Sequence, residues 1–175
     1  MINLNFSFQL NLSRHRTKGV APTDWIDEES AKNQAQSQAR QHFWEVFPAM
    51  AERLWEHLTA RLTQDAGRLS KVFPAEIKEA MLVNGRERVP QRNQLFIDNQ
   101  AYPAIYLDIQ LDSPGRSIRI NELRRESLES KGWESHQRLL LELDSNDEIV
   151  IKDIEGEILS VDEVSKFILE RFLRK

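Results

Sequence analysis

Residues 2–13 alternate between apolar and polar side chains without interruption. The residues between the apolar ones are all Asn, Ser or Gln, and the apolar set is Ile2, Leu4, Phe6, Phe8, Leu10 and Leu12. Successive side chains of a β-strand point to opposite faces, whereas a helix would scatter these apolar residues around its circumference. The segment is therefore predicted to be a strand with one buried face, and the fold must contain a sheet.

Further strands are predicted in the C-terminal half of the chain. Short apolar or alternating runs occupy residues 95–97, 102–112, 117–120, 137–143 and 148–152. The compositions of Pro114-Gly115, Asp144–Asp147 and Glu155-Gly156 are typical of turns, while the charged residues 122–136 lead to no prediction of an element. Strands joined by tight turns pair in antiparallel fashion, so this half is predicted to be a β-meander.

A long helical region is predicted between the first strand and the meander. Thr23 or Asp24 can cap a polar helix that runs to about residue 41, and residues 42–66 form a clearly amphipathic helix. Its stripe comprises Phe43, Phe47, Met50, Leu54 and Leu58, with Trp44, Trp55 and Leu62 on the flank. Pro48 lies inside this pattern, which predicts two nearly collinear helices or one kinked helix. Gly67 is its expected end.

Two shorter helices are also predicted. Pro74 begins one that reaches about Leu82, and residues 85–93 then form a polar connector. The C-terminal helix has the clearest local signal, because Ser160 and Glu163 have the spacing of a capping box. Its expected buried face comprises Val164, Phe167, Ile168 and Phe172.

The order of these elements predicts an α+β fold. A mostly antiparallel sheet, made of the N-terminal strand and the C-terminal meander, packs against a long amphipathic helix and a C-terminal helix. We expect a single domain over residues 1–175, in which residues 13–93 are a largely helical insertion.

Composition excludes several classes of function. The chain has no Cys, so a disulfide framework and a Cys-based zinc site are excluded, and a reducing cytoplasm is the expected location. No stretch is apolar enough for a membrane span. There is neither a nucleophile elbow nor a glycine-rich phosphate loop, so we expect no cofactor and no nucleophilic catalysis. A metal-dependent hydrolase is the least favoured hypothesis, and its candidate carboxylates are Asp108, Glu142, Asp144 and Asp153.

The leading hypothesis is a non-enzymatic interaction module or small subunit that binds another protein or a second copy of itself. Aromatic residues cover more than one face of the helix at 42–66, and such residues are enriched at interfaces. The candidate interface residues are Phe43, Trp44, Phe47, Trp55 and Leu58. The N-terminal strand could pair with another chain if it lies at a sheet edge.

The alternative hypothesis is a nucleic-acid-associated accessory subunit. Arginines gather in several predicted loops, and a basic patch would form if the fold brought these loops to one face. The candidate residues are Arg14, Arg16, Arg86, Arg88, Arg119, Arg124 and Arg125. The net charge of −4 gives no overall attraction to nucleic acid.

Overall fold

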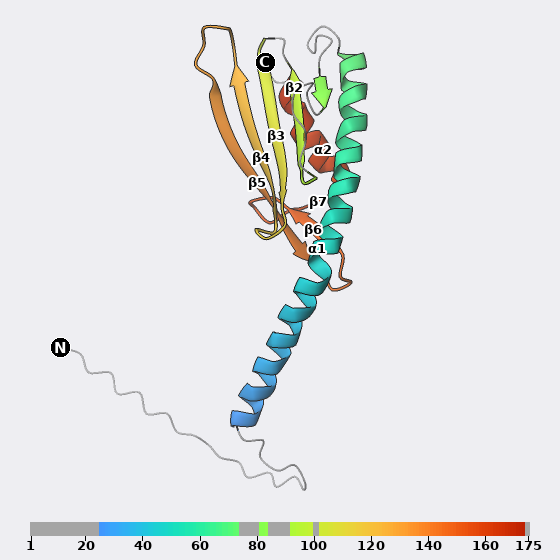
Figure 1. Cartoon of the computed structure of the whole chain (residues 1–175), viewed down its shortest axis with the longest axis vertical. Helices are drawn as coiled ribbons and strands as arrows, with labels where there is room; N and C mark the ends of the chain where they lie inside the picture. Colours follow the sequence, from blue (N-terminus) through green and yellow to red (C-terminus); the bar gives the residue numbers. More distant parts are fainter. Residues whose placement is uncertain (1–24, 74–80, 84–91, 100–101, 174–175) are drawn as a thin grey trace, which may run out of the picture. The chain divides into compact units, whose positions relative to one another are not determined.

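Seven strands form one antiparallel sheet in the computed structural model, which describes residues 25–73, 81–83, 92–99 and 102–173. Each strand pairs with the next along the chain, so the sheet is a plain meander (Figure 1). The strands are β1 (Met81–Val83), β2 (Gln94–Asn99), β3 (Ala104–Asp112), β4 (Ser117–Arg125), β5 (Trp133–Leu143), β6 (Ile149–Lys152) and β7 (Ile158–Leu159).

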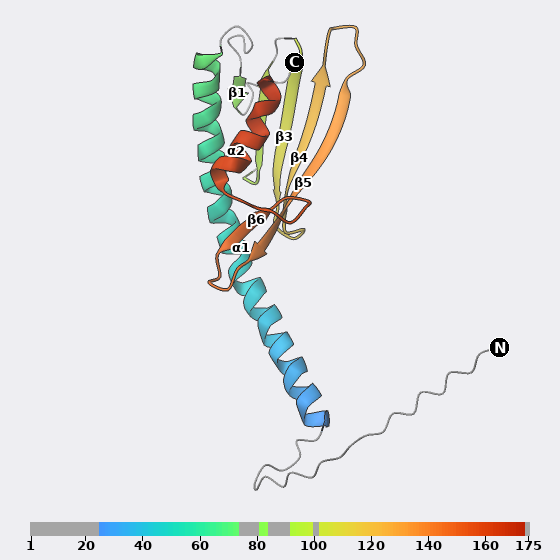
Figure 2. The same ribbon diagram turned by 180° about the vertical axis from the view of Figure 1, so that it is seen from behind.

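Alternation along the strands separates a core face from an open face. In β3 the four predicted apolar residues are all buried, and the residues between them are half-buried. The predicted turn at Asp144–Asp147 joins β5 to β6 with Leu143 opposite Ile149. Two helices, α1 (Trp25–Val72) and α2 (Val161–Leu169), contribute side chains to one core with the strands, and Figure 2 shows α2 across the core face. The predicted α+β class and antiparallel meander are thus confirmed.

Chain contacts divide the molecule into two units, residues 1–40 and 41–175. Within the described part of the first unit, residues 25–40 are helical and every side chain is exposed. The second unit holds the sheet, the core and α2. The predicted strand at residues 2–13 lies outside the described residues, so the expected single domain with an insertion at 13–93 stays a prediction.

The helix α1 continues through both positions at which the sequence suggested an interruption. Pro48 has no amide hydrogen to donate to the Trp44 carbonyl, but both residues are exposed, so water can satisfy that carbonyl. Gly67 does not end the helix. Two residues later Leu69 packs against the core, which stabilises the extension to Val72.

The buried stripe of α1 differs from the predicted one. It consists of Phe47, Ala51, Trp55, Leu58, Leu62 and Ala66, while Met50 and Leu54 are only half-buried. Small alanine side chains let a helix approach a sheet closely, and the buried stripe therefore includes Ala51 and Ala66. The indole nitrogen of Trp55 donates to the Arg92 carbonyl at 3.1 Å, which orients this large side chain within the core.

The capping box of α2 is confirmed. The Glu163 amide donates to the Ser160 hydroxyl oxygen at 3.2 Å, and the Glu163 carboxylate accepts from the Ser160 amide at 2.8 Å. On the face toward the sheet, Val164 and Ile168 are fully buried. A short 3₁₀-helix, Glu170–Leu173, follows and places Phe172 in the core.

One predicted helix end is wrong. Residues 81 and 82 belong to strand β1, not to a helix, because Met81–Val83 pairs with β2; residues 74–80 of that predicted helix lie outside the described residues. The charged region 122–136, for which the sequence led to no prediction, is partly strand. It holds the end of β4 and the start of β5, and the strand there tolerates Glu122 in a buried position because Arg171 pairs with it.

Candidate functional site

Strand β5 is longer than the strand that follows it. It pairs with β4 along residues 133–140, but with β6 only along residues 140–143. No strand of the described ranges pairs with residues 133–139 on the side away from β4. We call this stretch the β5 edge. An exposed strand edge presents backbone donors and acceptors that can pair with another segment.

The backbone groups of the β5 edge alternate in direction. The Leu141 amide donates to the carbonyl of Arg116, the residue just before β4, at 2.9 Å, so the backbone groups of Leu141 point toward β4. Because neighbouring residues of an antiparallel strand turn these groups to opposite sides, the even-numbered residues turn theirs away from β4. The amides and carbonyls of Glu134, His136 and Arg138 therefore face outward.

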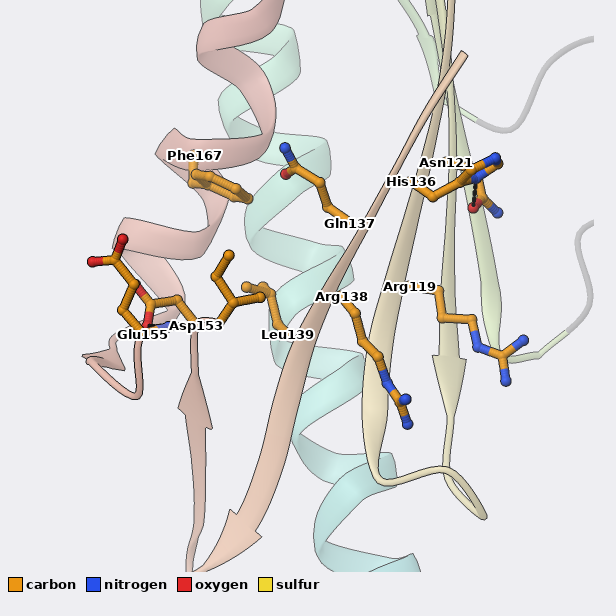
Figure 3. A pocket seen from close by; sticks show the side chains of 10 residues that line it. Arg119, Asn121, His136, Gln137, Arg138, Leu139, Asp153, Glu155 and Phe167 are labelled. Carbon is orange, nitrogen blue, oxygen red and sulfur yellow. Dashed lines mark hydrogen bonds between the residues drawn. The ribbon is translucent and has the colours of Figure 1, made fainter.

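A cavity of about 630 Å³ runs along the β5 edge and reaches both faces of the sheet. We call it the edge groove. It is lined by Arg119, Asn121, His136, Gln137, Arg138, Leu139, Asp153, Ile154, Glu155 and Phe167. In Figure 3, Gln137 and Leu139 lie on the side of Phe167 from α2, whereas His136 and Arg138 lie on the opposite side with Asn121 and Arg119 of β4.

The groove exists because the chain leaves the sheet directly after β6. Asp153 begins a tight turn in which its carboxylate accepts from the amides of Glu155 and Glu157 at 2.9 and 2.8 Å. Gly156 has a φ of 88°, a conformation that glycine adopts without a Cβ clash. The turn returns the chain to β7, which pairs with Ile151 and Lys152, so β6 never reaches the β5 edge.

The side of the groove next to α2 holds its apolar residues, together with Asp153 and Glu155 (Figure 3). Leu139 is buried, Phe167 is half-buried, and Ile154 is 86% exposed. The guanidinium of Arg171 lies 4.8 Å from the centre of the Phe167 ring and also donates to the Gln137 side chain. The same guanidinium donates to the buried Glu122 carboxylate at 2.8 Å. These contacts hold Phe167 and Gln137 in fixed positions.

The side of the groove on the open face is polar. A ring nitrogen of His136 lies 2.9 Å from the side-chain oxygen of Asn121, and Arg138 donates to the Gly115 carbonyl at 2.6 Å. Arg119 pairs with Asp112. Burial opposes ionisation of Asp112, but hydrogen bonds from the Gly115 amide and Arg119 outweigh it and keep its pKa below the ordinary value. The cation is thereby held at the rim of the groove.

This arrangement can bind an extended polypeptide. It combines outward backbone donors and acceptors with apolar side chains on the α2 side and polar side chains on the open face. Across residues 25–73, 92–99 and 102–173, no three His, Asp or Glu side chains are grouped to hold a metal. The four candidate carboxylates have other partners. Gln94 and Gln110 donate to Asp108, Lys152 pairs with Glu142, and backbone amides donate to Asp144 and Asp153.

The structure separates the predicted interface residues. Phe47, Trp55 and Leu58 are buried in the core, so they cannot form a contact surface: these aromatic and aliphatic side chains fill the space between α1 and the sheet. Trp44 is 55% exposed, with the half-buried Phe43 at its edge 5.2 Å away. Of the predicted set, only this pair remains at the surface.

The predicted arginine patch is only partly described. Arg14, Arg16, Arg86 and Arg88 lie outside the described residues. Of the others, Arg124 pairs with Glu126 at 2.7 Å and Arg119 with Asp112, while Arg125 is exposed at the end of β4. Two of these three charges are therefore offset by carboxylates. Nucleic-acid binding stays a prediction of the sequence.

Reasoning from the sequence missed the edge groove, although a signal for it was present. The turn at Asp144–Asp147 sets the register between the two strands that it joins. In this register residue 139 would face residue 153, and residue 137 would face residue 155. Glu155-Gly156 was itself predicted to be a turn, so β6 had to end before it could cover residues 137–139. The unequal lengths of the two flanking runs thus indicated an open edge.

Comparisons with protein-family models, with curated proteins and with solved structures gave no match. Among the described helices, none is long and apolar enough to cross a membrane.

Proposed function

We propose that this protein is a non-enzymatic interaction module that binds an extended segment of a partner protein as an additional strand on β5. The observation that carries the proposal is the β5 edge, where Glu134, His136 and Arg138 turn their backbone groups outward beside the edge groove. A cytoplasmic location is part of the proposal and is supported by the cysteine-free sequence.

The chemistry of the groove explains how affinity and selectivity would arise. Main-chain hydrogen bonds to His136 and Arg138 would supply affinity that depends little on sequence. The next strand would sit about 4.8 Å from β5, with alternate side chains on the two faces. Those on the α2 side would meet Leu139, Phe167 and Ile154, so the groove would select segments with apolar residues at every second position.

A proline at position 136 tests the proposal directly. His136→Pro removes one outward amide but leaves the hydrogen bonds to β4, because those come from odd-numbered residues. His136→Ala removes the same side chain and keeps the amide, so it is the matched control. Leaving the facing carbonyl of a bound strand unsatisfied would weaken binding roughly tenfold to a hundredfold.

The assay is photo-crosslinking in the source cells with a benzophenone side chain. It is placed at position 154 in the groove or, as a control, at position 72 on α1, which does not line the groove. Both Ile154 and Val72 are exposed. We expect position 154 to crosslink a defined partner, His136→Pro to remove that product, and His136→Ala to retain it. Equal crosslinking by both His136 variants, with circular dichroism showing both folded, would refute the proposal.

A further inference from the structure

We propose that the strand bound at the β5 edge is residues 2–13 of a second copy of this chain, exchanged reciprocally in a dimer. This inference rests on the proposed function, since it names the partner of the same groove. Its basis is the match between the alternating residues 2–13 and the two sides of the edge groove, together with the exposure of every residue from 25 to 40 in α1.

The two faces of residues 2–13 correspond to the two sides of the groove. Alternate residues are Ile, Leu or Phe, and the residues between them are Asn, Ser or Gln. Paired with β5, one set would lie against Leu139, Phe167 and Ile154. The other set would lie on the open face, beside the amide of Asn121 and the cation of Arg138.

The charge of the segment also suits the site. Residues 2–13 contain no charged side chain. Arg138 and Asp153 line opposite parts of the groove and already have hydrogen-bond partners, Gly115 and the turn amides. A neutral strand therefore brings no charge of its own into the groove, whereas each charge on a charged strand would have to lose water on docking, which would cost free energy.

The described part of the first unit indicates that the partner is another copy. Residues 25–40 are helical, yet every side chain is exposed, including Trp25 at 73% and Ile26 at 55%. These residues belong to α1, yet none of them contributes to the core, so they can contact another molecule. A second copy would bring both the missing strand and an identical helix, and reciprocal exchange gives a closed two-fold assembly rather than an open polymer.

Matched substitutions in the full chain test the strand by its faces. Phe6→Asp with Phe8→Asp places two charges on the apolar face, whereas Ser7→Asp with Gln9→Asp places the same charges on the polar face. By light scattering we expect twice the chain mass for the unmodified protein and for the polar-face variant. The apolar-face variant should have the mass of one chain.

Disulfide trapping tests the position, because any introduced cysteine is the only one in its chain. Chains with Ser7→Cys are mixed with chains carrying Arg138→Cys. Asn5→Cys and Gln9→Cys replace Ser7→Cys in parallel mixtures, because they cover the neighbouring registers of the strand on β5. We expect a crosslinked dimer that is absent when Glu56→Cys, on an exposed part of α1, replaces the position-138 variant.

Three results would overturn this inference: a single-chain mass for the unmodified protein, equal masses for the two double variants, or a disulfide that forms only when both cysteines are in one chain. The proposed function fails separately. If crosslinking from position 154 captures a different protein and still depends on the amide of residue 136, the β5 edge binds a strand, but not residues 2–13.

Discussion

Replacing Arg171 with Met should be among the most destabilising single changes in this protein. The Arg171 and Glu122 side chains are only 7% and 6% exposed, and their charged groups lie 2.8 Å apart. Methionine preserves most of the apolar stem but leaves the carboxylate buried without its cation. Breaking a buried ion pair on one side costs about 3–5 kcal/mol, far more than breaking an exposed pair.

The structure indicates that most of this cost comes from the carboxylate left behind. Arg171 also donates to the Gln137 side chain and stacks on Phe167, and each lost contact adds about 1 kcal/mol or less. The double variant Glu122→Leu with Arg171→Met removes both charges. It should therefore recover most of the loss and can even exceed the unmodified protein in stability.

Urea unfolding monitored by circular dichroism would measure these differences for both single variants and the double variant. We expect a coupling free energy of at least about 2 kcal/mol between the two positions. A cost below about 1 kcal/mol for Arg171→Met, or additive effects in the double variant, would show that the pair is not buried in solution and would refute the reasoning.

Three further predictions follow from local contacts. Ser160→Ala removes the cap of α2 and should lower the free energy of unfolding by about 1 kcal/mol, measured by urea denaturation. Leu58→Ala empties a fully buried position and should cost about 2–5 kcal/mol in the same assay. Burial raises the pKa of Asp65, but hydrogen bonds from Arg61 and Ser165 outweigh burial and leave it below the ordinary value. Its stabilisation is therefore present above the unfolded pKa of about 4 and is lost as the pH falls through the lower folded value.

Each of these predictions has a matched comparison. Ser145→Ala, in an exposed turn, should leave stability nearly unchanged, and an equal loss there would contradict the capping explanation. His57→Ala, next to Leu58 but exposed, should cost less than about 1 kcal/mol. Asp65→Asn should flatten the acid part of the stability curve between about pH 5 and pH 2. An unchanged slope would mean that this carboxylate does not contribute to the pH dependence.

Local patterns in the sequence predicted much of the second unit. The alternation of Ile105, Leu107, Ile109 and Leu111 specified both a strand and its buried face. The spacing of Ser160 and Glu163 identified the start of α2, because a capping box needs only residues within one turn. The turn at residues 144–147 likewise set the pairing of β5 with β6.

Patterns failed where a distant residue decides the outcome. No local pattern indicates that β4 and β5 extend into a charged region, because Glu122 is neutralised by a residue 49 positions away. Trp55, predicted to be a flank residue, is buried in the core, and its indole nitrogen donates to the carbonyl of Arg92, 37 residues away. The β1 strand forms only through its pairing with β2, since three residues are too short for a clear period.

The sequence alone therefore determined the fold class, the faces of the strands and the start of the C-terminal helix, because each follows from side chains within a few residues of one another. The tertiary structure decided which aromatic side chains are buried and which strand edge stays open. Both depend on how far β6 extends beside β5 and on how closely α1 approaches the sheet, and these distances are set by packing between segments far apart in the chain.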